Sequence, residues 1–304
     1  MIRGTDILRW HERYGWPIPM GEWGVIQGGH RTPFRAVLEE NDPVELETFL
    51  DSGLSEVALV AGIVSGTEGG REFMGGAARF NLVEWKKASA DPDVERLDAP
   101  DVGYPVVLPH EGFMIMVDTP RHDHYAEEIS RVLPGGTVLE IGSGYGGLAL
   151  QLLRWNPAFR LVLVDLPSAL YLAGYWLSRV CDAEVGWWDE CPQAQILLVP
   201  SHELDQWGGT PDLAVATHSL SEFGAIEAGR YLAWLHEHEV RYFYHDNAVK
   251  KPVEYGDGRR TWEEWPEVLA AELVPGPPYV ERWRKQIDWA MSARRYGEFF
   301  YERI

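Results

Sequence analysis

From about residue 122 onwards, short runs of apolar residues alternate with longer segments in which apolar residues recur at helical spacing. Short apolar runs bounded by turn residues indicate buried strands, and a recurrence at every third or fourth position indicates a helix. Strands that alternate with such helices predict a parallel sheet covered on both faces. We therefore expect an α/β domain with strands at residues 137–142, 161–165, 195–199, 213–217 and 242–245 and helices at 125–133, 147–155, 168–180 and 225–238.

The two ends of the chain follow other patterns. Near the C-terminus, residues 288–293 and 298–303 are strand-like runs joined by a short turn, which predicts an antiparallel hairpin. The N-terminal region combines short helical patterns, among them residues 43–50 and 55–63, with glycine- and proline-rich joints. We expect this region to be mainly helical.

Glycines gather where the first expected strand should turn into a helix. The sequence from Glu140 to Gly147 reads Glu-Ile-Gly-Ser-Gly-Tyr-Gly-Gly. Glycine adopts positive φ at little cost and lets a ligand approach the backbone closely, and doubly wound sheets bind ligands at the carboxyl ends of their strands. Asp165 ends the next strand, where a carboxylate accepts hydrogen bonds from both ribose hydroxyls of a nucleoside cofactor. The same letters fit the dinucleotide fingerprint, so the loop alone leaves two cofactor classes open.

Five motifs stand at or near the ends of the expected strands: Val138-Leu-Glu-Ile-Gly-Ser-Gly-Tyr-Gly-Gly147, Leu163-Val-Asp-Leu-Pro167, Thr217-His-Ser-Leu-Ser-Glu-Phe223, Tyr242-Phe-Tyr-His-Asp-Asn247 and Glu298-Phe-Phe-Tyr-Glu-Arg303. With them, residues 121–304 resemble class I methyltransferases that use S-adenosylmethionine (SAM), and more narrowly the bacterial sugar O-methyltransferases. The resemblance implies a Rossmann-like sheet of seven strands closed by the antiparallel hairpin. It also implies that residues 1–120 form a mainly helical cap that shapes acceptor choice or dimerisation.

Three features favour SAM over a nicotinamide cofactor. Glu140 stands two residues before the first glycine, where many methyltransferases place an acid near the methionine end of SAM. The glycine motif also lies behind a large N-terminal region, and the expected sheet ends in a hairpin. The alternatives are an NAD(P)-dependent oxidoreductase and an inactive methyltransferase-like binding subunit. The resemblance implies cofactor contacts from Glu140, Gly142, Ser143, Gly144, Gly146, Asp165, Leu166, Ser201, Thr217, Arg121 and Tyr125.

Methyl transfer to a hydroxyl needs a positioned base or a metal ion, because a sugar hydroxyl is not ionised at neutral pH. His218 follows the fourth expected strand and is our first choice, since imidazole titrates near neutral pH. Glu222 is the second choice, either as the base or as the group that orients His218. His245, at the end of the fifth expected strand, is the third. The competing interpretation is a hydrogen-bonded loop histidine and a glutamate that stabilises a helix N-terminus.

Asp246 and Asn247 resemble the Asp-Asn pair of metal-dependent O-methyltransferases, whose oxygen ligands suit magnesium. Those enzymes also carry an acid at the end of the fourth strand, where this chain has Thr217-His218-Ser219. We therefore predict no metal ion, with the Asp-Asn pair as the alternative site, and a turn or capping role for both residues.

Other polar and aromatic groups are interpreted as structural. His122 and His124 lack fixed partners for a metal site, and Asp123 is expected to cap the helix that follows it. Trp187 and Trp188 are expected to pack in the core rather than border an adenine ring.

The net charge of −20 repels phosphate backbones and anionic lipids, so we expect neither nucleic acid nor membrane as a partner. The sequence shows no apolar run long enough to cross a bilayer and no signal-peptide pattern at its start. Cys181 and Cys191 lack zinc-site spacing and are read as thiols of a reducing compartment. We expect a cytoplasmic enzyme with a small hydroxylated acceptor, and leave homo-oligomerisation open.

Overall fold

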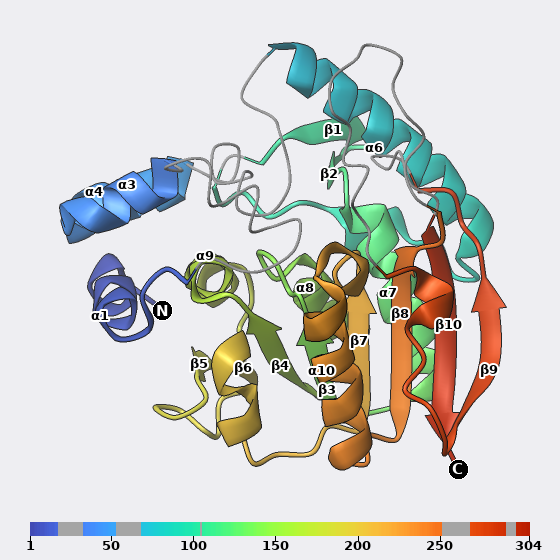
Figure 1. The fold of residues 1–304 in the computed structure, drawn as a ribbon. Coiled ribbons are helices and arrows are strands. Elements are labelled where there is room, and N and C mark those ends of the chain that lie inside the picture. Colours follow the sequence, from blue (N-terminus) through green and yellow to red (C-terminus); the bar gives the residue numbers. More distant parts are fainter. Residues whose placement is uncertain (18–32, 53–67, 104, 251–267, 290–295) are drawn as a thin grey trace, which may run out of the picture.

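The structure is a computed structural model that describes residues 1–17, 33–52, 68–103, 105–250, 268–289 and 296–304 (Figure 1). The helix expected at 55–63 lies outside these residues. With η for a 3-10 helix, the elements are α1 (Gly4–Tyr14), α3 (Pro33–Glu40), α4 (Pro43–Ser52), α6 (Glu68–Ala88), η1 (Val94–Leu97), β1 (Val107–His110), β2 (Phe113–Met116), α7 (Thr119–Val132), β3 (Gly136–Ile141), α8 (Gly147–Trp155), β4 (Phe159–Asp165), α9 (Pro167–Val180), β5 (Val185–Trp187), β6 (Ile196–Pro200), η2 (Ser201–Gln206), β7 (Leu213–Thr217), η3 (Leu220–Glu222), α10 (Ala225–Glu237), β8 (Tyr242–Ala248), η4 (Ala270–Glu272), β9 (Tyr279–Lys285) and β10 (Tyr296–Arg303).

The central sheet has the strand order β5-β6-β4-β3-β7-β8-β10-β9. Its first six strands run parallel to one another, and β10 pairs antiparallel with both β8 and β9. A parallel sheet finished by an antiparallel hairpin is the expected arrangement. The number of strands is eight rather than seven, because the short edge strand β5 is added beside β6. Its three residues are too few to show a periodic pattern in the sequence.

The hairpin uses a different partner strand from the one predicted. β10 pairs with β9, at Tyr279–Lys285, and not with residues 288–293, of which 290–293 lie outside the described part. β9 is an edge strand with exposed charged side chains, such as Arg282 and Arg284, which hide it from a search for apolar runs. Trp289 lies in the segment expected to form this strand, but its ring is buried against the rings of His124 and Tyr125.

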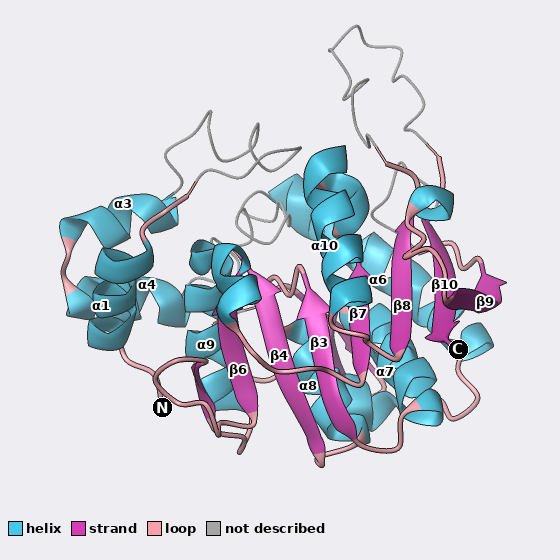
Figure 2. Ribbon diagram, turned by 60° about the horizontal axis from the view of Figure 1, so that its bottom comes forward, coloured by secondary structure: helices cyan, strands magenta, loops and turns pink. Residues whose placement is uncertain are grey.

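Helices cover both faces of the sheet, as Figure 2 shows. Along β4, Leu161 and Leu163 point into the core under α7, α8 and α9, whereas Val162 and Val164 point into the core under α10 and η2. This alternation follows from the two-residue period of a strand. Because β4 is buried on both faces, its centre from Leu161 to Val164 is a continuous apolar run.

The N-terminal helices α1, α3 and α4 lie at the β5 edge of the sheet, beside α9 (Figure 1). Tyr14 of α1 stacks on Trp187 of β5 with ring centroids 4.6 Å apart, and Trp10 packs on the same indole. Arg9 pairs with Glu190 at 3.0 Å on the loop that follows β5. The packing role expected for Trp187 is therefore confirmed.

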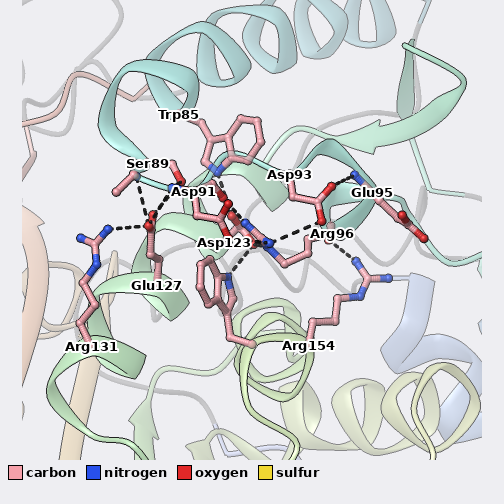
Figure 3. A network of polar contacts seen from close by, with 12 residues as sticks. Trp85, Ser89, Asp91, Asp93, Glu95, Arg96, Asp123, Glu127, Arg131 and Arg154 are labelled. Carbon is pink, nitrogen blue, oxygen red and sulfur yellow. Dashed lines mark hydrogen bonds and ion pairs between the residues drawn. The ribbon is translucent and has the colours of Figure 1, made fainter.

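A second contact joins the N-terminal region to α7, as seen in Figure 3. Asp123 is fully buried, and its carboxylate accepts hydrogen bonds from the indoles of Trp85 at 2.9 Å and Trp155 at 2.8 Å and from Arg96 at 3.3 Å. The prediction that Asp123 caps the helix is wrong, because α7 begins at Thr119 and places Asp123 inside it. In the described part of the chain, no helix is both long and apolar enough to span a membrane.

Candidate active site

The order in which successive strands are added to the sheet reverses at β3. β4, the next strand in sequence, pairs with one side of β3, whereas β7 pairs with the other. In doubly wound sheets the crevice at such a switch point, beyond the carboxyl ends of the strands, is the ordinary ligand site. The glycine loop between β3 and α8 lies at this point.

Positive φ angles shape the glycine loop. Gly142, Gly144 and Gly146 have φ values of 79°, 53° and 88°, which residues with side chains rarely adopt. A Cβ on Gly142 would lie 2.4 Å from Cβ of Ser219, so the loop packs directly on the segment after β7. A Cβ on Gly144 would meet no atom within 4 Å, which leaves the loop open on that side.

Asp165 fastens the loop to the end of β4. Its Oδ2 accepts the N–H of Gly144 at 2.7 Å, and its Oδ1 accepts the N–H of Leu166 at 2.6 Å. Burial raises the pKa of Asp165 to about 6, although the two N–H donors oppose this shift. The carboxylate thus lies at the crevice with one donor on each oxygen and with lone pairs left for further donors.

Glu140 is a buried acid at the end of β3. Its side chain is 4% exposed, and Oε2 has no hydrogen-bond partner among the described residues. Its pKa is raised well above the usual range by burial and by the charge of Asp165. Ser143 Oγ is also buried without a partner there. Two unsatisfied polar groups beside a glycine loop fit a polar ligand, because buried polar atoms are normally hydrogen-bonded.

The remaining cofactor candidates divide into two groups. Leu166, Ser201 and Thr217 stand at the carboxyl ends of β4, β6 and β7, along the same edge of the sheet as the glycine loop. Arg121 and Tyr125, on α7, contact the acceptor-side candidates His218 and Asp246 in this structure. Their expected contact with the cofactor stays a prediction.

His218 lies at a crossing of three elements. It has a φ of 51°, an uncommon value for histidine, and its N–H donates to the carbonyl of Asp246 at 2.8 Å. Nη1 of Arg121 lies 2.7 Å from Nδ1 and 3.0 Å from Nε2 of the imidazole. Oδ2 of Asp246 is 3.5 Å from Nε2, and the ring stacks on Tyr296 of β10.

Asp246 is the acid that the structure places beside His218. It is 1% exposed and also accepts a hydrogen bond from the hydroxyl of Tyr125. Burial raises the pKa of Asp246 to about 6, and Tyr125 and Arg121 act in the opposite direction. Glu222, the acid proposed from the sequence as orienter, ends the short helix η3 and is half-buried.

β8 is longer than predicted, and this changes the interpretation of its polar residues. It continues to Ala248, so Asp246 and Asn247 lie within the strand and not after it. The predicted turn or capping role for the Asp-Asn pair is therefore wrong. Asn247 accepts the N–H of Ser221 at 3.0 Å and donates to the carbonyl of Ala216 at 3.0 Å. Adjacent strand residues face opposite sides of a sheet, so Asp246 and Asn247 do not converge on one ion.

His245 lies on the face of the sheet away from His218. It is fully buried among Phe243, Phe299 and Tyr301, and burial lowers its pKa to about 3. The structure does not bring this third catalytic candidate to the group around His218.

The other α7 histidines have separate surroundings. His122 lies beneath Gly147, and burial together with the charge of Arg121 lowers its pKa to about 3. His124 forms a buried ion pair with Glu298, whose oxygens are both 3.1 Å from Nε2. Trp188 donates its indole N–H to Glu203 at 3.1 Å.

Sequence reasoning missed three residues of this region. Asp118 forms an ion pair with Arg121 at 2.8 Å. Tyr145 of the glycine loop is buried, and the charges of Asp118 and Arg121 both act on its hydroxyl. Tyr296 covers the imidazole of His218. The spacing of Asp118 and Arg121 over one helical turn was the available signal for the first pair. For Tyr296 the sequence gives no local signal, since its partner lies in a distant segment.

Comparisons with known proteins return structures but no sequence family. No family model matches the chain, and no curated protein matches it. Similar solved structures include an O-methyltransferase family protein from Burkholderia thailandensis (16% identity, 61% of this chain and 60% of that chain, TM-score 0.39). Magnesium protoporphyrin IX methyltransferase from Synechocystis PCC 6803 is another (12%, 75% and 93%, 0.43), as is the methyltransferase domain of a bacterial Hen1 protein (18%, 60% and 97%, 0.45).

The chain spans 60% of the length of the Burkholderia protein, and 56% of the length of two further solved structures that it resembles. Identities this low carry no information on substrate or reaction, so we assign the fold from the topology of the sheet. The sheet has six parallel strands, a glycine loop at the switch point and a closing antiparallel hairpin. The chain has the Rossmann-like fold of class I methyltransferases.

Proposed function

We propose that this protein is a SAM-dependent methyltransferase that transfers a methyl group to a hydroxyl of a small molecule. The observation that carries the proposal is the pair of acids at the switch point. Glu140 is buried with an unpartnered oxygen, and Asp165 holds the open glycine loop through Gly144. A nucleoside cofactor with a cationic amino-acid end has a donor for each acid.

The residues present fit SAM in their chemistry. Glu140 and Ser143 would accept hydrogen bonds from its amino group, and Asp165 would accept them from its ribose. Gly144 would admit the cofactor close to the backbone, because that side of the loop is open. When bound, SAM supplies an electrophilic methyl group, and the protein supplies orientation, charge and a base.

His218 is the proposed base. It follows β7, and its neighbour Ser219 packs on Gly142 of the cofactor loop. Arg121 is permanently charged and can only donate, so it hydrogen-bonds the neutral imidazole, which is the form that accepts a proton. Arg121 must give up its hydrogen bond before that ring nitrogen takes the proton of the acceptor hydroxyl, and the carboxylate of Asp246 then stabilises the resulting imidazolium.

The acceptor is proposed to be a sugar or another polyhydroxylated metabolite, on the resemblance of the five motifs to sugar O-methyltransferases. An NAD(P)-dependent oxidoreductase is the second candidate, since the glycine loop and Asp165 fit a dinucleotide as well. The antiparallel β9–β10 hairpin beside β8 favours the methyltransferase. A binding subunit without activity is the third candidate, and only turnover separates it from the first.

A labelling experiment tests the proposal. Purified protein is incubated with methyl-labelled SAM and a small-molecule extract, in parallel with the His218→Ala variant and with an Asp182→Ala control at an exposed acid. We expect label in a hydroxylated metabolite with the wild type and the control, and far less with His218→Ala. Tight binding of NAD⁺ or NADP⁺ without binding of SAM would replace the proposal with the oxidoreductase. SAM binding without label transfer would favour the binding subunit.

A further inference from the structure

We propose that Tyr296 is a positioning residue for His218, and that the buried His124–Glu298 pair fixes Tyr296 in its place. The inference rests on the proposed function, in which His218 is the base. It assigns a role to the C-terminal hairpin, which otherwise only completes the sheet.

The contact between Tyr296 and His218 is a parallel stack. The ring centroids are 3.7 Å apart and the ring planes differ by 2°. Tyr296 is 6% exposed, and the side chain of His218 is 16% exposed. Nη1 of Arg121 lies within 3.0 Å of both ring nitrogens and Asp246 lies 3.5 Å from Nε2, while Tyr296 covers one face of the imidazole. The backbone of His218 is in the left-handed region, an uncommon conformation that the surrounding structure must hold.

Two residues beyond Tyr296, Glu298 of β10 contacts α7. Glu298 lies on the same side of the strand as Tyr296 and accepts from His124, with both oxygens 3.1 Å from Nε2. It also accepts the hydroxyl of Tyr244 at 2.9 Å. His124 lies one helical turn beyond Arg121, so neighbouring sites on α7 contact His218 and Glu298.

The His124–Glu298 pair is suited to fix the strand because it is buried and charged. Both side chains are 1% exposed. Burial lowers the pKa of His124, but the carboxylates of Glu298 and Glu128 together raise it by more, so the net shift is upward and favours the imidazolium. Glu128 and Lys285 also face this group, with opposite charges. Removing one member of a buried pair is costly, so the pair resists separation of β10 from α7.

Precise placement of the base matters because proton transfer requires hydrogen-bond geometry. A displacement of about 1 Å lowers a rate by about a hundredfold. Tyr296→Leu should remove the stack and lower kcat by about ten- to a hundredfold. Tyr301→Leu is the matched control, since Tyr301 is a buried tyrosine of the same strand in the core on the opposite face of the sheet.

The closing experiment measures kcat, SAM affinity and histidine resonances for these variants and for Glu298→Gln. We expect a lower kcat for Tyr296→Leu and Glu298→Gln with unchanged SAM affinity, and no further loss when the two are combined. A wild-type kcat in folded Tyr296→Leu, or equal losses in Tyr301→Leu, would overturn the role of Tyr296. A double variant whose loss is the product of the single losses would overturn the link to Glu298.

Nuclear magnetic resonance with isotope-labelled histidine separates this proposal from the proposed function. The stacked ring of Tyr296 shifts the imidazole signals of His218 whether or not the protein methylates anything. We expect those signals to move in Tyr296→Leu and Glu298→Gln and to stay in place in Tyr301→Leu. A protein that transfers no methyl group but shows these shifts would refute only the function. Unchanged signals in Tyr296→Leu would refute the positioning.

Discussion

Replacing Asp165 by alanine removes the carboxylate that fastens the glycine loop and that we expect to bind the ribose. Its two oxygens accept the N–H groups of Gly144 and Leu166 at 2.7 and 2.6 Å. A hydrogen bond to a charged group contributes about 1.5–3 kcal/mol. Loss of the ribose contact at this scale raises the Kd for SAM about ten- to a hundredfold. The loss of the bond to Gly144 acts in the same direction, because it loosens the loop.

Isothermal titration calorimetry measures this effect directly. Asp165→Asn keeps an acceptor oxygen without the charge and should lie between the wild type and Asp165→Ala. Asp182→Ala, at an exposed acid after α9, should bind SAM like the wild type. An unchanged Kd in a folded Asp165→Ala variant would refute the assignment of the cofactor site.

The pH dependence of binding gives the same prediction a second readout. Burial raises the pKa of Asp165 to about 6. The ionised carboxylate accepts hydrogen bonds on both oxygens, whereas the protonated acid loses part of that capacity. SAM affinity should therefore fall as the pH drops through about 6, and it should level off above that value. In Asp165→Asn this change should be weaker, so an identical pH profile would contradict the role of Asp165.

Three further predictions concern the base, the metal and the fold. His218→Ala should lower kcat by about a hundred- to ten-thousandfold, with SAM affinity nearly unchanged in calorimetry, and a normal kcat would exclude His218 as the base. EDTA should leave the methylation rate unchanged, because Asp246 and Asn247 face opposite sides of β8, and a loss restored by magnesium would indicate a metal-assisted mechanism. Asp123→Ala should lower the free energy of unfolding in urea by about 1–3 kcal/mol for each of the two indoles left without an acceptor, since Arg96 keeps Asp91 and Asp93, and a loss near zero would contradict this account.

The helices and strands that could be predicted from the sequence are those with an apolar pattern within their own residues. α8 and β7 have the predicted bounds, and β3, β4 and β6 differ from theirs by one or two residues, because strands buried on both faces are continuous apolar runs. β5 and β9 were not predicted. β5 has only three residues, and β9 is an edge strand rich in charge, so neither shows an apolar run of useful length.

The candidate site was predictable only where its residues follow one strand–loop–helix unit. The glycine loop and Asp165 belong to such a unit, and the structure joins them by a hydrogen bond. The surroundings of His218 come from α7, β8 and β10, which meet only through the fold. Asp246 was expected to follow β8 because a polar run normally ends a strand, but it lies inside the sheet, where the hydroxyl of Tyr125 donates to one of its oxygens.

The buried carboxylate of Asp123 also limits how this chain can be divided or recombined. It lies on α7, which belongs to the sheet domain, and two of its three donors, Trp85 and Arg96, come from the preceding region. A fragment that starts at residue 121 would keep Trp155 but leave the carboxylate with one donor in place of three. Exchange of the N-terminal region with that of a related protein would therefore require matching residues at both partner positions. Natural variation in this region should accordingly be coupled to position 123.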